Sequence, residues 1–134
     1  MRILLDTNIL LISISARSPH HWVINKLVEG LFELAVSNEI LLEYFEIIEQ
    51  KMDSLSPEFT LDLLDNLPNV VHIEPKFKWP LLVDEEDEKF SNCYLASNAN
   101  YIVTHDKGFR LLRKIDFPKF QIISLKEFKE ILSV

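Results

Sequence analysis

The sequence predicts an α/β fold in which helices cover both faces of a parallel β-sheet. Short runs of consecutive apolar residues alternate along the chain with segments of helical periodicity. Strands that are apolar throughout, rather than at every second residue, are typical of a parallel sheet buried on both faces. The 134 residues include only 2 Gly and 6 Pro, which favours short connections and no flexible linker. We therefore expect one domain over residues 1–134, a three-layer α/β/α sandwich with a central parallel sheet of about five strands.

Five apolar runs supply the expected strands. The first ends at an acidic residue, Asp6, and the second begins after Gly30. The third contains His72, which we interpret as a core residue of its strand. The strands are expected at residues 2–5, 31–36, 70–73, 101–103 and 120–123.

Helices are expected between these strands, and their ends carry recognisable signals. Ser37, Ser56 and Asp84 suit the N-cap position, and the residue after Ser56 is a proline, which favours the first helical position. Gly30 suits the C-terminal end of the helix before it, and a Ser-x-x-Glu capping box begins at Ser124. The helices are expected from residue 9, at 21–29, 38–51, 57–66, 85–99 and 107–114, and from 125 onward.

Composition and charge exclude several classes of protein. Acidic residues outnumber basic ones by 21 to 14, so a basic coat for nucleic acid is excluded, although a local basic patch is not. One cysteine excludes a disulfide framework and a cysteine zinc site. The apolar run before Asp6 is too short for a signal peptide, and no stretch approaches the roughly 20 apolar residues of a membrane span. We expect a soluble, cytoplasmic protein without membrane contact.

Acidic residues stand where the expected strands end or where the following helices begin. Asp6 and Asp106 come at the carboxyl ends of the first and fourth strands. Glu43 and the acidic run 84–88 lie in the N-terminal parts of later helices. Ligands of an open parallel sheet bind outside the carboxyl ends of its strands, and a helix entered from such an end begins on the same edge. The four acidic positions are therefore expected to converge.

Clustered carboxylates repel one another, and a hard divalent cation is the usual reason for bringing them together. Such a cation polarises a phosphodiester, lowers the pKa of a bound water and neutralises the leaving oxygen. Each acid alone also has a structural interpretation. Asp6, Asp84 and Asp106 suit helix starts, and Glu43 lies at the edge of an apolar stripe where solvent reaches it. The functional interpretation depends on the four positions together.

The order of these segments resembles the PIN-domain family, metal-dependent nucleases that include many toxins of bacterial and archaeal toxin–antitoxin pairs. The resemblance covers almost the whole chain, in the segments Ile3-Leu4-Leu5-Asp6-Thr7-Asn8, 37–44, 84–90 and Tyr101-Ile102-Val103-Thr104-His105-Asp106. It implies a PIN-like fold and a ribonuclease that uses Mg²⁺ or Mn²⁺ to hydrolyse single-stranded or looped RNA. It also implies an antitoxin protein as a partner and leaves self-association as a homo-oligomer open.

Residue by residue, the resemblance assigns Asp6, Glu43 and Asp106 to acids that hold Mg²⁺ or Mn²⁺. The family's third acid is usually an Asp on the helix before the last motif, and the spacing places it at Glu88, 18 residues before Asp106. Asp87 is adjacent and points about 100° away on a helix, so only one of the two fills that role. All five acids are candidates for the catalytic site.

Polar and basic side chains near these acids are candidates for substrate contact. In the resemblance, Thr104 supplies a hydroxyl beside the site and Asn8 orients the first Asp. A basic cluster then follows Asp106, in which Lys107, Arg110 and Lys114 share one face of the expected helix. In an acidic chain, this cluster is the best candidate for contact with phosphate groups. Simple exposure of one helix face to solvent would explain the cluster almost as well.

Other side chains are assigned structural roles. We interpret Cys93 as a core thiol, Trp22 and Trp79 as packing residues rather than base-stacking platforms, and His105 as part of a loop surface. No Cys/His/Asp arrangement typical of a nucleophilic enzyme is present.

Two other functions fit parts of the pattern. A phosphatase of the haloacid-dehalogenase kind also has an Asp after its first strand, but it has a second Asp two residues later, where this chain has Asn8. The other alternative is a non-catalytic PIN-like module that binds RNA or protein. Mn²⁺ binding discriminates between module and enzyme, because a degenerate module has no reason to hold four clustered charges.

Overall fold

The computed structural model describes residues 1–52, 57–81, 84–105 and 107–134, and at its centre lies a five-stranded sheet. The strand order is β3-β2-β1-β4-β5, and every neighbouring pair is parallel, as the sequence predicts. The strands are β1 (Arg2–Leu5), β2 (Glu33–Val36), β3 (Val70–His72), β4 (Tyr101–Val103) and β5 (Ile122–Ile123).

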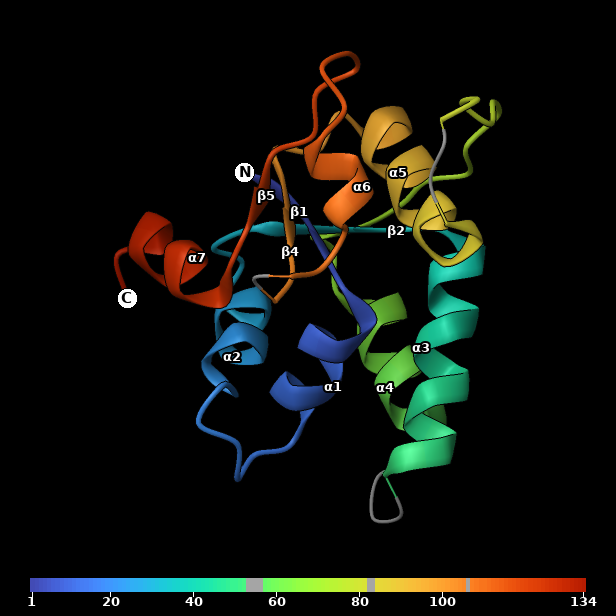
Figure 1. Ribbon diagram of the computed structural model, residues 1–134. Helices are drawn as coiled ribbons and strands as arrows, with labels where there is room; N and C mark the ends of the chain where they lie inside the picture. Colours follow the sequence, from blue (N-terminus) through green and yellow to red (C-terminus); the bar gives the residue numbers. More distant parts are fainter. Residues whose placement is uncertain (53–56, 82–83, 106) are drawn as a thin grey trace.

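Helices lie on both faces of this sheet. In Figure 1, α1, α2 and α4 lie on one side of the sheet and α5 and α6 on the other, which confirms the three-layer architecture. The helices are α1 (Thr7–Ile14), α2 (Trp22–Val28), α3 (Asn38–Lys51), α4 (Pro57–Asn66), α5 (Glu85–Ser97), α6 (Arg110–Arg113) and α7 (Leu125–Leu132). Within the described ranges, no helix is long and apolar enough to cross a membrane.

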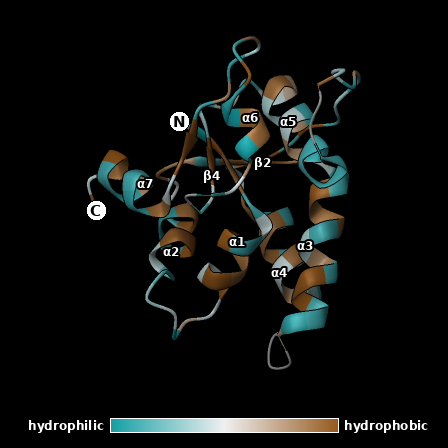
Figure 2. Ribbon diagram, in the orientation of Figure 1, coloured by the Kyte–Doolittle hydropathy of each residue, from teal (hydrophilic) through white to brown (hydrophobic). Residues whose placement is uncertain are grey.

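The central strand β1 carries the core. Ile3, Leu4 and Leu5 are fully buried between the helical layers, and Figure 2 shows brown hydrophobic residues along the strands and α1. The buried Tyr44 of α3 donates a hydrogen bond from its hydroxyl to the Leu5 carbonyl oxygen over 2.6 Å. This bond fixes α3 against the end of β1. Cys93 is buried in the core as expected, and burial raises the pKa of its thiol to about 12.

Most of the predicted helix ends are confirmed. The Ser37 hydroxyl accepts the Ile40 N–H at 3.2 Å, and both hydrogen bonds of the capping box at Ser124 are present. Gly30 follows α2 with φ +81°, a left-handed conformation that glycine adopts without steric cost. Asp84 stands at the N-cap of α5 without a capping hydrogen bond from its side chain. The N-cap expected at Ser56 lies outside the described residues.

Three local predictions are wrong. The helix expected over residues 107–114 is reduced to Arg110–Arg113, because Phe109 has φ +55° and this left-handed backbone cannot continue an α-helix. Lys107 and Lys114 therefore lie outside a helix rather than on a shared helical face. His72 is exposed and faces Asp65, with Nε2 and Oδ1 3.7 Å apart, because β3 is an edge strand. Trp79 is also exposed rather than packed.

Candidate active site

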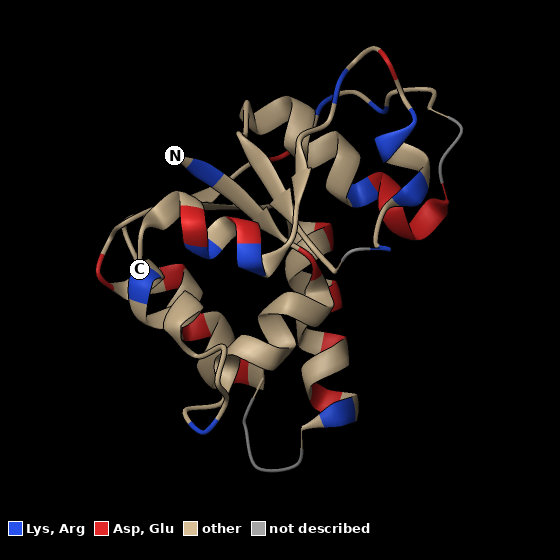
Figure 3. Ribbon diagram, turned by 60° about the vertical axis from the view of Figure 1, so that its left-hand side comes forward, with Lys and Arg blue, Asp and Glu red and all other residues tan. Residues whose placement is uncertain are grey.

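An acidic pocket opens where β1 ends. It has a volume of about 270 Å³ and combines residues from α1, α3 and α5 with the residue that joins β1 to α1. Its polar and charged lining residues are Asp6, Thr7, Asn8, Glu43, Lys51, Glu86 and Asp87. Figure 3 shows the red acidic first turn of α5, which forms one wall. The pocket lies at the carboxyl edge of the parallel sheet, where the sequence places it.

Asp6 is held in the pocket by hydrogen bonds of both its backbone and its side chain. Its backbone N–H donates to the Val103 carbonyl oxygen at 3.0 Å, and its side-chain Oδ2 accepts the Thr104 hydroxyl at 2.7 Å. Burial raises the pKa of the Asp6 carboxyl, with repulsion from Glu43 acting in the same direction. The hydrogen bond from Thr104 opposes this rise because it stabilises the charged form.

Thr104 needs a glycine nearby to hold this position. A Cβ atom on Gly108 would overlap the Thr104 hydroxyl oxygen, so a side chain there would displace the hydroxyl from Asp6. The chain has only two glycines, and this one keeps space for a group of the pocket. The scarcity of glycine is the signal that would have identified Gly108 in the sequence.

Glu43 has two partners that the sequence analysis missed. One of its carboxylate oxygens accepts the Thr7 hydroxyl, and the other lies 2.7 Å from the ammonium of Lys89 on α5. Both side chains of the ion pair are about one-fifth exposed. The ion pair therefore fixes the Glu43 side chain in the pocket. On a helix face that only meets solvent, the carboxylate would have no such partner. The signal for Lys89 was that it is the first basic residue after the acidic run 84–88.

Asp87 and Glu88 face different surroundings. Asp87 lines the acidic pocket, and Glu88 does not. The pKa of Asp87 rises from 3.8 to about 6, first through burial and then through repulsion from Asp84, Asp6 and other carboxylates. Phe90, three residues after Asp87, is buried against Phe109 with ring centroids 5.4 Å apart. This packing sets the rotation of α5 and turns Asp87 toward the pocket.

The other predicted site residues are placed in different ways. Asn8 is exposed at the first turn of α1 and lines the acidic pocket. Lys107, Arg110 and Lys114 are exposed, and none of them lines this pocket. Lys51, at the end of α3, is the lysine that does. Asp106 lies outside the described residues.

The donor set of the pocket fits a divalent cation in its chemistry. Across residues 1–52, 57–81, 84–105 and 107–134, no group of three acidic, histidine or cysteine side chains is close enough to form a complete metal site. Burial raises the pKa of both Asp6 and Asp87, and neighbouring carboxylates add to the rise, Glu43 at Asp6 and Asp84 with Asp6 at Asp87. Carboxylate oxygens with raised pKa values that face one pocket are ligands that a hard cation stabilises.

Comparisons with known proteins agree with the fold. A family model described as "PIN domain" matches residues 2–108. The crystal structure of VapBC2 from Rickettsia felis, bound to a DNA fragment from their promoter, has a similar fold with a TM-score of 0.64. That similarity covers 92% of this chain and 98% of the other at 17% sequence identity. No curated protein matches this sequence significantly.

Proposed function

This chain belongs to the PIN-domain family, and from that membership and the acidic pocket we propose that it is a Mg²⁺- or Mn²⁺-dependent endoribonuclease. The observation that carries the proposal is the convergence of Asp6, Glu43 and Asp87 from three separate elements on one open pocket. The pKa of Asp87 is raised to about 6, first by burial and then by the neighbouring carboxylates Asp84 and Asp6. Such an arrangement costs folding free energy and is characteristic of functional sites.

Each residue of the chain has a distinct task in this proposal. Asp6 and Asp87 would hold the cation, together with Asp106, whose role comes from its match to the family's final motif. The bound cation supplies charge neutralisation at the phosphodiester and a more acidic water. Thr104 keeps the Asp6 carboxylate oriented through its hydrogen bond. Glu43, oriented by Thr7 and Lys89, would accept a proton from the attacking water.

Asp87 rather than Glu88 takes the role of the third acid in this proposal. The spacing to Asp106 favours Glu88. Of the two residues, however, Asp87 lines the acidic pocket and Glu88 does not. Carboxylates must face the same space to share a cation, so the geometry supports Asp87.

A toxin of a toxin–antitoxin pair, acting in the cytoplasm, is the biological role that we propose for this activity. PIN-domain membership supports it, and the similar fold of a VapBC2 complex is consistent with it. An antitoxin protein is the expected partner, and a second copy of the chain is a further one. A short reading frame encoded next to this one would support the role directly.

One observation favours a non-catalytic module as the second candidate. The Lys89 ammonium lies 2.7 Å from a Glu43 carboxylate oxygen and compensates its charge. In a module that has lost catalysis, such internal pairing would replace the cation. Mn²⁺ binding therefore separates the two candidates, because only the nuclease requires it.

Cleavage of an unstructured RNA by the purified chain tests the proposal. We expect cleavage with Mg²⁺ or Mn²⁺ and none with EDTA. Asp6→Asn and Asp87→Asn should each lose most activity, whereas Glu88→Gln and the exposed-residue control Asp116→Asn should retain it. All variants are purified in parallel, so that a contaminating nuclease would appear equally in each. Equal activity of wild type and Asp6→Asn, or full activity in EDTA, would reject the nuclease.

A further inference from the structure

A loop between β3 and α5 exposes alternating basic and aromatic side chains. Its sequence is Lys76-Phe77-Lys78-Trp79, and we call residues 74–81 the basic–aromatic loop. Phe77 is 78% exposed and Trp79 is 42% exposed, while both lysines are also exposed. Large aromatic side chains seldom remain in water without a partner. The sequence analysis assigned Trp79 to packing, and the structure leaves its role open.

The basic–aromatic loop is attached to the helix that carries Asp87. The Trp79 backbone N–H donates to the Asn92 side-chain oxygen at 3.1 Å, and Leu81 N–H donates back to the Trp79 carbonyl at 2.8 Å. Asn92 belongs to α5 and is only 6% exposed, so it is a fixed anchor. The backbone at Trp79 is therefore held relative to the acidic pocket.

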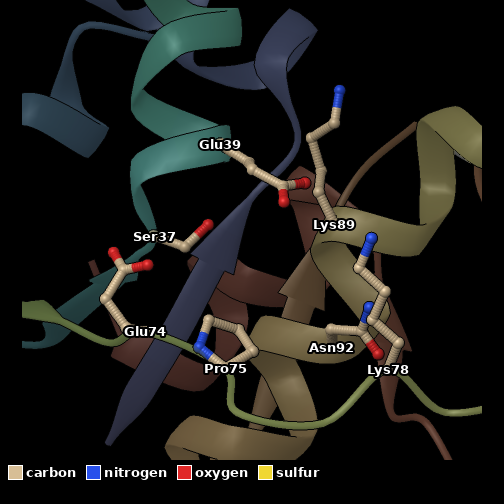
Figure 4. A pocket seen from close by; sticks show the side chains of 7 residues that line it. All are labelled: Ser37, Glu39, Glu74, Pro75, Lys78, Lys89 and Asn92. Atoms are coloured by element: carbon tan, nitrogen blue, oxygen red, sulfur yellow. The ribbon is translucent and has the colours of Figure 1, made fainter.

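A small pocket of mixed charge lies between the loop and the acidic pocket. Its volume is about 60 Å³, and Lys78, Lys89 and Asn92 line it together with the carboxylates Glu39 and Glu74. In Figure 4, the Lys78 side chain runs beside Asn92 and its ammonium points toward the part of α5 that carries Lys89. Lys89 in turn binds Glu43 of the acidic pocket. From Asp87 to Asn92 the rise along α5 is about 7.5 Å, so the two regions are neighbours.

We propose that Phe77 and Trp79 form a stacking platform for unpaired bases of RNA, and that Lys76 and Lys78 contact the phosphates between them. Aromatic side chains interleaved with positive charges bind single strands without sequence preference, since every base presents a π-face. The bases of a duplex are already stacked and cannot use the platform. The proposal rests on the proposed function for the identity of the ligand, and it adds a binding subsite outside the acidic pocket.

A protein partner is the competing occupant of this surface. Lysine is depleted from the buried centres of protein interfaces, whereas here a lysine precedes each of the two aromatic residues. In a chain of net charge −7, residues 74–81 carry two lysines and one acid, Glu74, and this local excess of positive charge suits an anionic ligand. Both features favour nucleic acid.

Binding of oligouridine in EDTA tests the platform without cleavage. The chain has two tryptophans, so Trp22→Phe leaves Trp79 as the only tryptophan, and we expect oligouridine to quench the tryptophan emission. In the wild-type background, Phe77→Ala and Trp79→Ala should each weaken binding about tenfold, within the range measured for base–aromatic stacking. The matched control is Phe117→Ala, an 86% exposed phenylalanine on another loop, which should bind as wild type.

The phosphate contacts have a separate readout. A Lys76→Ala/Lys78→Ala double variant should flatten the plot of log affinity against log salt by about 0.7 for each lost contact. Binding by Phe77→Ala and Trp79→Ala equal to wild type, absence of quenching, or tighter binding of a duplex would overturn the platform. Trp79 emission that responds to a protein partner and not to RNA would also overturn it.

The same experiment separates this inference from the proposed function. If metal-dependent cleavage is present but the aromatic variants bind RNA normally, the platform fails and the nuclease stands. If cleavage is absent, but oligouridine quenches Trp79 emission and the aromatic variants bind it more weakly, the platform stands and the chain is an RNA-binding module.

Discussion

Replacing Asp87 by asparagine should make the metal-free protein more stable at neutral pH, although it removes a charge from the pocket that we assign to catalysis. The pKa of Asp87 is raised to about 6 in the folded protein, whereas an unfolded chain ionises near 3.8. The folded state thus holds an extra proton between these values, and its free energy of unfolding falls as pH rises from about 4 through about 6. Above that range Asp87 is ionised in both states, and its charge lowers the free energy of unfolding by the full amount. The Asp87→Asn substitution removes this charge and its cost.

The size of the effect follows from the pKa shift. A rise of the Asp87 pKa from 3.8 to about 6 corresponds to a loss of about 3 kcal/mol in the free energy of unfolding before screening is considered. The Asp87 side chain is only partly buried, so solvent screening reduces the expected gain to about 1 kcal/mol. In a domain of 134 residues this raises the melting temperature by roughly 3–5 °C.

Glu88→Gln is the matched control for this experiment. Both residues lie in the first turn of α5, so both substitutions lose the favourable interaction of an acid with the helix dipole, roughly 0.3–1 kcal/mol. Only Asp87 lines the acidic pocket. The difference between the two variants therefore isolates the cost of the Asp87 charge in the pocket, which comes first from burial and then from repulsion.

Thermal unfolding by circular dichroism between pH 4 and pH 8, with EDTA or Mn²⁺, measures the effect. We expect Asp87→Asn to melt above Glu88→Gln at pH 7.5 in EDTA and level with it at pH 4. Mn²⁺ should stabilise wild type by about 1.4 kcal/mol for each tenfold of free metal above the dissociation constant, and Asp87→Asn by much less. A difference that does not change with pH, or equal stabilisation of both variants by Mn²⁺, would refute the reasoning.

Three further substitutions test the supports of the site. Gly108→Ala should push the Thr104 hydroxyl off Asp6 and reduce cleavage at least tenfold, with circular dichroism confirming that the fold persists. Thr104→Val should raise the pKa of Asp6 further, because it removes a hydrogen bond to the charged form, and should move the acid limb of the pH–rate profile to higher pH. Tyr44→Phe should lower the free energy of unfolding in urea by about 1 kcal/mol, since the Leu5 carbonyl loses its donor; an unchanged urea midpoint would contradict this.

The elements and their order could be predicted because their signals are local. Continuous apolar runs and cap residues such as Ser37 and Ser124 depend on neighbours a few positions away. The failures occur where a local signal is overridden. The left-handed backbone at Phe109 shortens α6, and the edge position of β3 exposes His72, and neither is encoded in hydrophobic periodicity.

The sequence by itself therefore determined a parallel sheet with acids at its carboxyl edge, because burial pattern and chain direction fix that edge. Only the tertiary structure decided which acid enters the pocket and which aromatic residues remain in water. The rotation of α5 depends on the packing of Phe90 against Phe109, and it selects Asp87 over Glu88. The backbone N–H of Trp79 is held by the side chain of Asn92, 13 residues later, while the Trp79 side chain is 42% exposed. Both are contacts between segments, and their geometry is set only when the layers pack together.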